Sequence, residues 1–137
     1  TNRYSVPPQY IGTTLQMLIH PLHRSVALMG PQGMKDIGKT IMQKAQYAAR
    51  KLSAINGVKA PLHDAPYFKE FVVDFNATGI TVEEVNNALL KEGIFGGKDL
   101  SREFPSLGQS ALYCITEVHS KNDIDHLVET LNEILTR

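Results

Sequence analysis

The sequence contains only one cysteine, Cys114, among its 137 residues. A single thiol excludes an internal disulfide, and it also excludes a zinc site built from several thiolates. Such sparing use of cysteine is typical of a reducing compartment, so we expect a cytoplasmic protein. Cys114 lies in an apolar run with no activating residue beside it. We therefore expect a buried structural thiol and not a nucleophile.

The chain also lacks an excess of charge and a long apolar run. Lysine and arginine together number 14, as do aspartate and glutamate, whereas nucleic-acid-binding proteins normally carry a basic excess or stripe. No apolar stretch approaches the roughly 18 residues that a transmembrane helix requires. No basic start with an apolar centre indicates a signal peptide. We expect neither a nucleic-acid nor a membrane partner.

What is present is the composition of a globular domain. The chain is 42% apolar and 20% charged, which is enough to bury a core without disulfides or a structural metal. Residues 1–32 show no clear pattern: a short helix over residues 10–19 is expected to stop at Pro21. Because the chain begins at Thr1 without a methionine, we expect this segment to be the junction to a missing upstream domain. Residues 33–137 are expected to form one domain.

Regular spacing of apolar residues predicts a long amphipathic helix from Gly33 onward, ended by Asn56-Gly57. Its apolar face consists of Met34, Ile37, Ile41, Ala45, Ala48, Leu52 and Ile55. Alternation over residues 67–75 predicts a strand. Two capping boxes, in which a hydroxyl residue precedes an acidic one by three positions, begin two further helices: Thr81 with Glu84, and Ser120 with Asp123.

A glycine-containing connector, residues 94–110, separates these two helices. Gly93 is expected to end the earlier helix, and a short strand is expected near Ile94. The apolar run within residues 111–118 predicts a central strand, covered on both faces or wedged between neighbours. The resulting order is helix, strand, helix, short strand, strand, helix. It predicts an α+β fold in which a small, mainly antiparallel sheet packs with helices.

Residues 33–40, GMKDIGKT, match the phosphate-loop pattern of nucleotide hydrolases. Such a loop follows directly from a buried strand and wraps its amides around phosphate, but residues 30–32 separate this motif from the preceding apolar residues. Met34 and Ile37 also belong to the apolar face of the predicted helix. A hydrolase needs a parallel sheet of about five strands, and the sequence predicts two or three. We interpret the match as a coincidence within a helix.

Few other residues suggest a site. His20 and His23 are separated by Pro21 and lack a third ligand, so we expect no metal there. We expect the remaining histidines at the surface: His63, His119 and His126. The most informative polar group lies on the connector and comprises Lys98, Asp99, Arg102 and Glu103. It is either a set of local ion pairs of little weight or an anion contact, since arginine offers a bidentate fork.

Residues 91–119, KEGIFGGKDLSREFPSLGQSALYCITEVH, resemble the C-terminal region of glycine decarboxylase, the P-protein of the glycine cleavage system. The likeness is to the first subunit of the two-subunit bacterial form. Supporting segments are residues 52–59 (LSAINGVK), 68–75 (FKEFVVDF) and 123–129 (DIDHLVE). The resemblance covers residues 26 to 135 and is far more specific than the phosphate-loop pattern.

The resemblance implies the small C-terminal domain of a fold-type I pyridoxal-phosphate enzyme. It also implies that the complete enzyme decarboxylates glycine and passes the aminomethyl group to the lipoyl arm of a carrier, the H-protein. The cofactor would be held by a lysine of a companion subunit, so we expect this chain alone to bind no cofactor and to be inactive. Lys98 and Arg102 would contact a carboxylate, the carrier or the partner subunit.

Two other functions stay open at this point. The chain is alternatively a free-standing small α+β domain that binds a ligand or another protein, which a native product of only this size would support. A nucleotide hydrolase ranks below it, and nucleotide binding by the purified chain would support that function.

Overall fold

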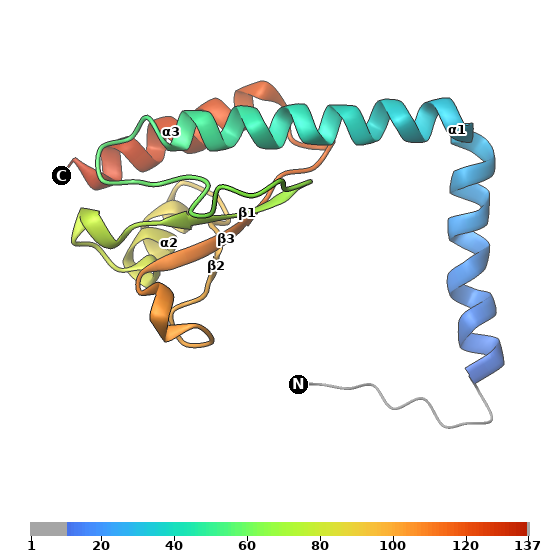
Figure 1. Cartoon of the computed structure of the whole chain (residues 1–137), viewed down its shortest axis with the longest axis horizontal. Helices are drawn as coiled ribbons and strands as arrows, with labels where there is room; N and C mark the ends of the chain where they lie inside the picture. The colour runs from blue at the N-terminus through green and yellow to red at the C-terminus, as the bar shows by residue number, and fades with distance from the viewer. Residues whose placement is uncertain (1–10, 137) are drawn as a thin grey trace. The chain divides into compact units, whose positions relative to one another are not determined.

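A computed structural model describes the backbone of residues 11–136 and the side chains of residues 24–136. Within these residues, helices and strands follow one another in the predicted order (Figure 1). Their bounds are α1 Ile11–Leu52, β1 Glu70–Asp74, α2 Val82–Lys91, β2 Lys98–Asp99, β3 Ser110–Cys114 and α3 Lys121–Leu135. Backbone contacts divide the chain into two units, Thr1–Gly38 and Lys39–Arg137, and the second holds the sheet.

Helix α1 is longer than predicted, and Pro21 does not interrupt it. Within the helix, non-helical angles occur at Gly30 (φ 64°, ψ 178°). Proline has a helical φ and removes one hydrogen bond, whereas the residue before Pro31 is pushed out of the helical region, and glycine tolerates a positive φ. The expected break at Pro21 is therefore wrong, and the break lies at Gly30.

The phosphate-loop letters, residues 33–40, are helical throughout, as predicted. Amides that point along a continuing helix cannot wrap around a phosphate. The two strand pairings among the described residues are also both antiparallel, unlike the parallel sheet of a nucleotide hydrolase. These two observations contradict the nucleotide-hydrolase alternative.

The second part of α1, residues 39–52, packs on the sheet with the predicted apolar face. Ala45, Ala48 and Leu52 are completely buried. The helix ends at Leu52, earlier than expected, although Ile55 is also buried. Gly57 then takes the left-handed conformation predicted for it, with φ 81°.

The sheet has three strands in the order β1-β3-β2, with β3 antiparallel to both neighbours. Phe71 of β1 lies opposite Tyr113 of β3, and Val73 lies opposite Ala111. The predicted antiparallel sheet with a central strand is therefore confirmed. The short strand expected near Ile94 is wrong, because β2 begins at Lys98.

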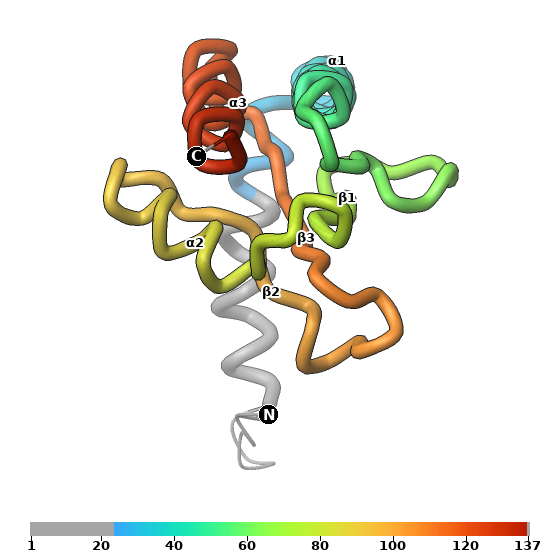
Figure 2. Tube along the Cα trace, turned by 90° about the vertical axis from the view of Figure 1, so that its left-hand side faces the viewer, coloured from blue at the N-terminus to red at the C-terminus, as the bar shows by residue number. Residues whose placement is uncertain are grey.

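The core lies on one face of this sheet. Figures 1 and 2 show α3 alongside the second part of α1, with the sheet below both. Side chains from these helices and from α2 form one cluster with Phe71, Val73, Ala111 and Tyr113. On the other face of β3, Leu112 is half-buried. Of the two arrangements predicted for this strand, β3 therefore has the second, a strand wedged between neighbours. Its two faces are not equally covered, because side chains alternate along a strand and only every second one meets the helices.

Both predicted capping boxes are present. The Thr81 hydroxyl accepts a hydrogen bond from the Glu84 N–H at 3.2 Å, and the Glu84 carboxylate accepts one from the Thr81 N–H at 2.9 Å. Ser120 and Asp123 exchange the same pair of bonds at 3.1 and 2.7 Å. Each pair satisfies two amides that the first turn of a helix leaves free, and so sets where α2 and α3 begin.

Helix α2 ends as predicted at Gly93, which has φ 76°. The next amide, that of Ile94, still donates to the Leu89 carbonyl at 3.0 Å. This bond closes the helix C-terminus and explains why no strand forms at Ile94.

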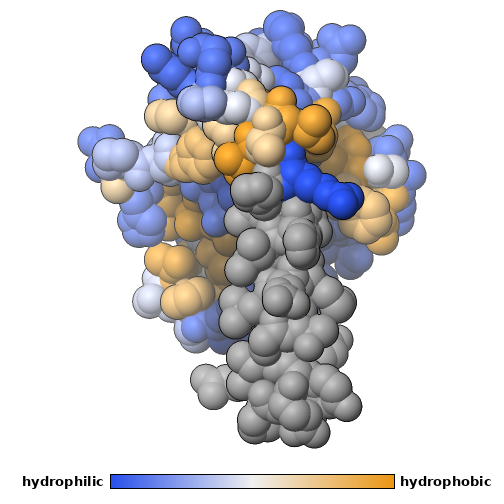
Figure 3. Space-filling model, turned by 90° about the vertical axis from the view of Figure 1, so that its right-hand side faces the viewer, coloured by the Kyte–Doolittle hydropathy of each residue, from blue (hydrophilic) through white to orange (hydrophobic). Residues whose placement is uncertain are grey.

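No helix among the described residues is both long enough and apolar enough to cross a bilayer. Figure 3 shows hydrophilic and apolar residues interspersed over the described part of one face.

Candidate functional site

Lys98, one of the two cations predicted as contacts, already has a local partner. Its Nζ atom lies 2.8 Å from a carboxylate oxygen of Glu103, and the two side chains are 59% and 55% exposed. Exposed pairs of this kind contribute about 0–1 kcal/mol. The charge of Lys98 is therefore matched on the connector itself.

Arg102 is the freer of the two cations. It is exposed and forms no ion pair or hydrogen bond with another described residue. Hydrogen bonds from Ser101 hold the pKa of Asp99 below its usual value, and the charge of Arg102 adds to this effect. Arg102 and Asp99 line a polar cavity of about 260 Å³ together with three residues of α2: Glu83, Asn86 and Asn87.

A larger cavity, of about 390 Å³, lies between the end of α2, the end of β3 and the first turns of α3. We call it the α2–α3 cavity. Its lining is largely apolar and includes Ile94, Phe95, Ile115, Ile124 and Leu127. Phe95 is 89% exposed, so it stands at the edge of this cavity and does not fill it.

Tyr113 lines the α2–α3 cavity, and its hydroxyl is buried. The residue is 4% exposed, and no donor or acceptor among the described residues forms a full hydrogen bond with its Oη atom. Burial raises the pKa of Tyr113 to about 12, and a weaker backbone interaction with Gly97 offsets part of that rise. The hydroxyl therefore keeps its proton at neutral pH and can donate it to an acceptor.

Gly97 allows the Tyr113 ring to lie where it does. A Cβ atom at Gly97 would meet Tyr113 Cε2 at 2.5 Å and Ala111 Cβ at 3.0 Å. Sequence reasoning missed Tyr113 as a functional candidate. The signal that points to it is the Gly96-Gly97 pair, because glycine beside a strand often marks the close approach of another group.

Titratable residues complete the lining of the α2–α3 cavity. His119 is half-buried, and its Nδ1 atom accepts a hydrogen bond from the Thr116 N–H at 3.0 Å, so this nitrogen carries no proton. Hydrogen bonds from Ser120 lower the pKa of Asp123, which caps α3. The remaining members are Glu92, Cys114 and His126, and no described lysine or arginine belongs to the lining.

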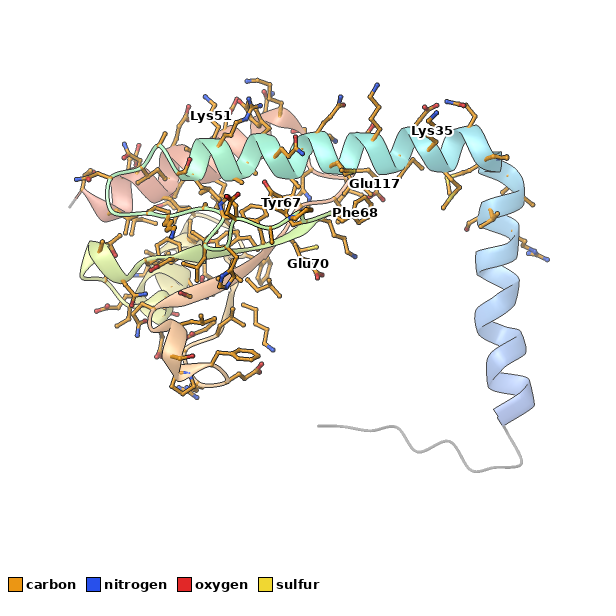
Figure 4. The ribbon with its side chains drawn as sticks, viewed as in Figure 1. Lys35, Lys51, Tyr67, Phe68, Glu70 and Glu117 are labelled. Atoms are coloured by element: carbon orange, nitrogen blue, oxygen red, sulfur yellow. The ribbon has the colours of Figure 1, made fainter. Side chains whose placement is uncertain are left out.

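Cys114 is exposed, so the expected buried thiol is wrong. It lies opposite Glu70 of β1, and Figure 4 shows Glu70 directed away from the helices, on the open side of the sheet. His63 and His126 are exposed, as expected. The side chains of His20 and His23 lie outside the described residues. Among the described residues, no three potential ligands are grouped to hold a metal ion.

Comparisons with known proteins find related sequences and a similar fold. Probable glycine dehydrogenase (decarboxylating) subunit 1 of Staphylothermus marinus is 38% identical over 110 residues, which are 80% of this chain and 23% of that protein. The protein of the same name from Thiobacillus denitrificans is 34% identical over 138 residues, 98% of this chain and 30% of the relative. This chain is related to a part of glycine dehydrogenase (decarboxylating) subunit 1.

The structural comparison agrees with the sequence comparison. A crystal structure of glycine decarboxylase (P-protein) of the glycine cleavage system, in inhibitor-bound form, has a similar fold. The alignment covers 80% of this chain and 24% of the crystallised chain. The TM-score is 0.70 at 28% identity. A NifS-like protein shares the fold alone, with a TM-score of 0.61 at 14% identity. No profile of a known protein family matches the chain. The predicted resemblance and fold class are confirmed.

The chain spans about a quarter of the length of the glycine dehydrogenase relatives that it matches. Its described residues do not fit pyridoxal phosphate, which an enzyme holds through a lysine in an enclosed site. No described lysine is buried, and none lines the α2–α3 cavity. Lys51, for example, stands on the outer side of α1 (Figure 4).

Proposed function

We propose that this chain is the C-terminal domain of subunit 1 of a cytoplasmic glycine dehydrogenase (decarboxylating). The complete enzyme would remove the carboxylate of glycine and pass the aminomethyl group to the lipoyl arm of the H-protein. The observation that supports this proposal is the 34–38% identity to subunit 1 over 80–98% of the chain. The shared fold supports it independently of the detailed alignment.

The part of this domain in catalysis would be indirect. Pyridoxal phosphate would be held by a lysine of a companion subunit, since every described lysine of this chain is at least partly exposed to water. The domain would brace the rest of subunit 1 and the companion subunit. Its connector, residues 95–109, would border the cleft between them.

Within the connector, Arg102 is the better candidate for contact with a carboxylate, the carrier or the partner subunit. Lys98 is engaged by Glu103 at 2.8 Å, whereas Arg102 keeps its guanidinium exposed beside a polar cavity. A planar guanidinium can bind a carboxylate through two parallel hydrogen bonds. We therefore assign the larger share of any such contact to Arg102.

The activity is tested with the full gene product that contains this chain. We expect it to release CO2 from carboxyl-labelled glycine when it is mixed with the pyridoxal-phosphate-bearing companion subunit and lipoylated H-protein. H-protein that lacks the lipoyl group is the control and should support little release. A full gene product that neither binds the companion subunit nor supports CO2 release would contradict the proposal.

The role of Arg102 is tested in the same assay. Loss of a charged hydrogen bond typically costs about 1.5–3 kcal/mol, so Arg102→Ala should lower kcat/KM at least roughly tenfold. Lys98→Ala, the matched control on the same connector, should stay within about twofold of the unchanged enzyme, because its ion pair is local. Unchanged activity and assembly in Arg102→Ala would remove Arg102 from the site.

A further inference from the structure

The α2–α3 cavity has the size and the lining of a site for a small molecule. Its volume is about 390 Å³, and pockets that bind small ligands are mostly apolar and measure about 300–1,000 Å³. Ile115, Ile124 and Leu127 are buried residues of the core that also line it. At its edge, the Phe95 ring is 89% exposed. The apolar part of the lining can therefore receive an aliphatic chain, because burial of apolar surface is favourable.

The charged groups of the lining favour a ligand with a positive charge. Glu92 and Asp123 both line the cavity, and no described lysine or arginine does. The lining also holds two histidines, of which His126 is exposed. The ring of the other, His119, is uncharged, since its Nδ1 atom accepts a hydrogen bond from the Thr116 N–H at 3.0 Å. The field inside the cavity is therefore set by the two carboxylates.

Glu92 is the better of the two carboxylates for contact with a cation. Asp123 accepts a hydrogen bond from the Ser120 N–H at 2.7 Å and lies in the first turn of α3, where the positive end of the helix offsets its charge. Glu92 lies at the C-terminus of α2, and this end of a helix attracts cations. Glu92 is exposed and forms no ion pair with another described residue.

We propose that the α2–α3 cavity binds a small aliphatic ammonium compound, with its alkyl chain against the apolar lining and its charged head beside Glu92. The exposed ring of Phe95 contributes to the site, because the face of an aromatic ring attracts an ammonium group. Glycine itself does not suit the cavity, since it has no apolar body and its own carboxylate would meet Glu92. The inference goes beyond the proposed function and does not depend on it.

Methyl NMR of the full gene product that contains this chain tests the site. The protein is labelled with ¹³C at the isoleucine δ1 methyl groups and titrated with n-hexylamine at about pH 8, where a primary amine is charged. The signals of Ile94, Ile115 and Ile124, which line the cavity, should shift with a Kd on the order of 1 mM. Ile41 and Ile134 do not line it, and their signals should stay in place.

Two other ligands separate the apolar contact from the charge. 1-Hexanol has the same alkyl chain without a charge and should bind roughly threefold more weakly than n-hexylamine, because an exposed ion pair contributes up to about 1 kcal/mol. Hexanoate, whose charge is opposite, should bind at least roughly tenfold more weakly. Glycine should leave the three lining methyl signals unshifted.

Two matched pairs of variants locate the ligand. Glu92→Gln should weaken n-hexylamine binding roughly threefold and leave 1-hexanol binding unchanged, whereas Glu129→Gln, at an exposed position of α3 outside the cavity, should change neither. Phe95→Ala should weaken both ligands, and Phe104→Ala, which removes a ring that is 53% exposed and does not line the cavity, should weaken neither. All four positions are exposed, so these changes should not unfold the domain.

Each outcome decides one part of the inference. Lining methyl signals that do not shift in the full gene product overturn the site. Equal affinities for n-hexylamine and hexanoate, or unchanged n-hexylamine binding in Glu92→Gln, overturn the assignment of the charged head. Shifts confined to the lining methyl groups that Glu92→Gln weakens support the inference. The CO2 assay of the proposed function can succeed or fail independently of all these results.

Discussion

The charged stretch of the connector, residues 98–103, and the α2–α3 cavity treat their polar groups in opposite ways. On the connector, Lys98 is matched by Glu103 and Asp99 by Ser101, all within five residues of one another. Beside the cavity, the Tyr113 hydroxyl is buried, and its one polar neighbour among the described residues is the backbone of Gly97. Local matching leaves Arg102 as the cation of this stretch that can still bind a partner, whereas the Tyr113 hydroxyl is shielded from solvent by the fold. From the sequence, the charged connector is the most informative polar group. The structure adds Tyr113, whose buried hydroxyl the sequence did not reveal.

The largest expected effect comes from crowding Tyr113, which lines the cavity. Gly97→Ala would place a methyl group 2.5 Å from Tyr113 Cε2, and overpacking of this kind lowers the free energy of unfolding by about 1–3 kcal/mol. Gly38→Ala is the matched control. It has no atom within 4 Å and should stabilise α1 by roughly 0.5–1 kcal/mol. Urea unfolding of this chain measures both, and equal stability of the two variants would refute the steric argument.

The next effect concerns Asp123, which lines the cavity and caps α3. Ser120→Ala should lower stability by about 1 kcal/mol, the usual contribution of an N-cap hydroxyl. Hydrogen bonds from Ser120 hold the pKa of Asp123 below its ordinary 3.8. The carboxylate therefore stabilises the fold above pH 3.8, and this contribution is lost as the pH falls through the lower pKa of the folded state.

An NMR titration of the Asp123 carboxyl group checks the same argument. Its pKa should rise toward 3.8 in Ser120→Ala, because the cap hydroxyl no longer donates to the carboxylate. Glu84, whose pKa is lowered in the same way by Thr81, serves as an internal control and should keep its pKa.

A smaller effect tests the connector side. Lys98→Met removes the ion pair with Glu103 and should lower stability by less than about 1 kcal/mol, with the difference shrinking at high salt. Lys91→Met is the comparison, since Lys91 is exposed and forms no ion pair with a described residue. A salt-independent loss of several kcal/mol in Lys98→Met would show that Lys98 contributes more to stability than its exposed ion pair with Glu103.

The smallest expected effect is the sharpest test of the comparison. Tyr113→Phe deletes a hydroxyl that forms no full hydrogen bond with a described residue, so it should leave the unfolding free energy of this chain unchanged or slightly raise it. A loss of more than about 1 kcal/mol would mean that the hydroxyl is bonded, and the contrast with the connector would disappear.

Local patterns in the sequence were sufficient to predict the elements that local forces define. Both capping boxes, the apolar face of α1 from Ala45 to Leu52 and the central antiparallel strand are present. The failures depend on tertiary context. The apolar run around Cys114 looks continuous in sequence, but the helices cover only one face of β3, and Cys114 faces away from them.

Two further failures have the same origin. Pro21 has a helical φ by itself, and the sequence alone does not show that the chain leaves the helix at Gly30 instead. Tyr113 reads as an ordinary strand residue until the fold brings Gly97 beneath its ring. The residue types of the connector left local ion pairs and an anion contact both open. The contact predicted for Lys98 and Arg102 stays a proposal.

The position of β3 in the sheet sets the order in which a newly made chain can fold. Both β1 and β2 bond to β3, yet β3 is synthesised last. Until residues 110–114 have left the ribosome, β2 has no described strand to pair with. By then β1 has only the bridge between Lys59 and Asp74 and the hydrogen bond from the Leu62 N–H to the Val72 carbonyl at 2.8 Å. A chain that stalls before this point exposes two open strand edges, which are prone to pair with other molecules.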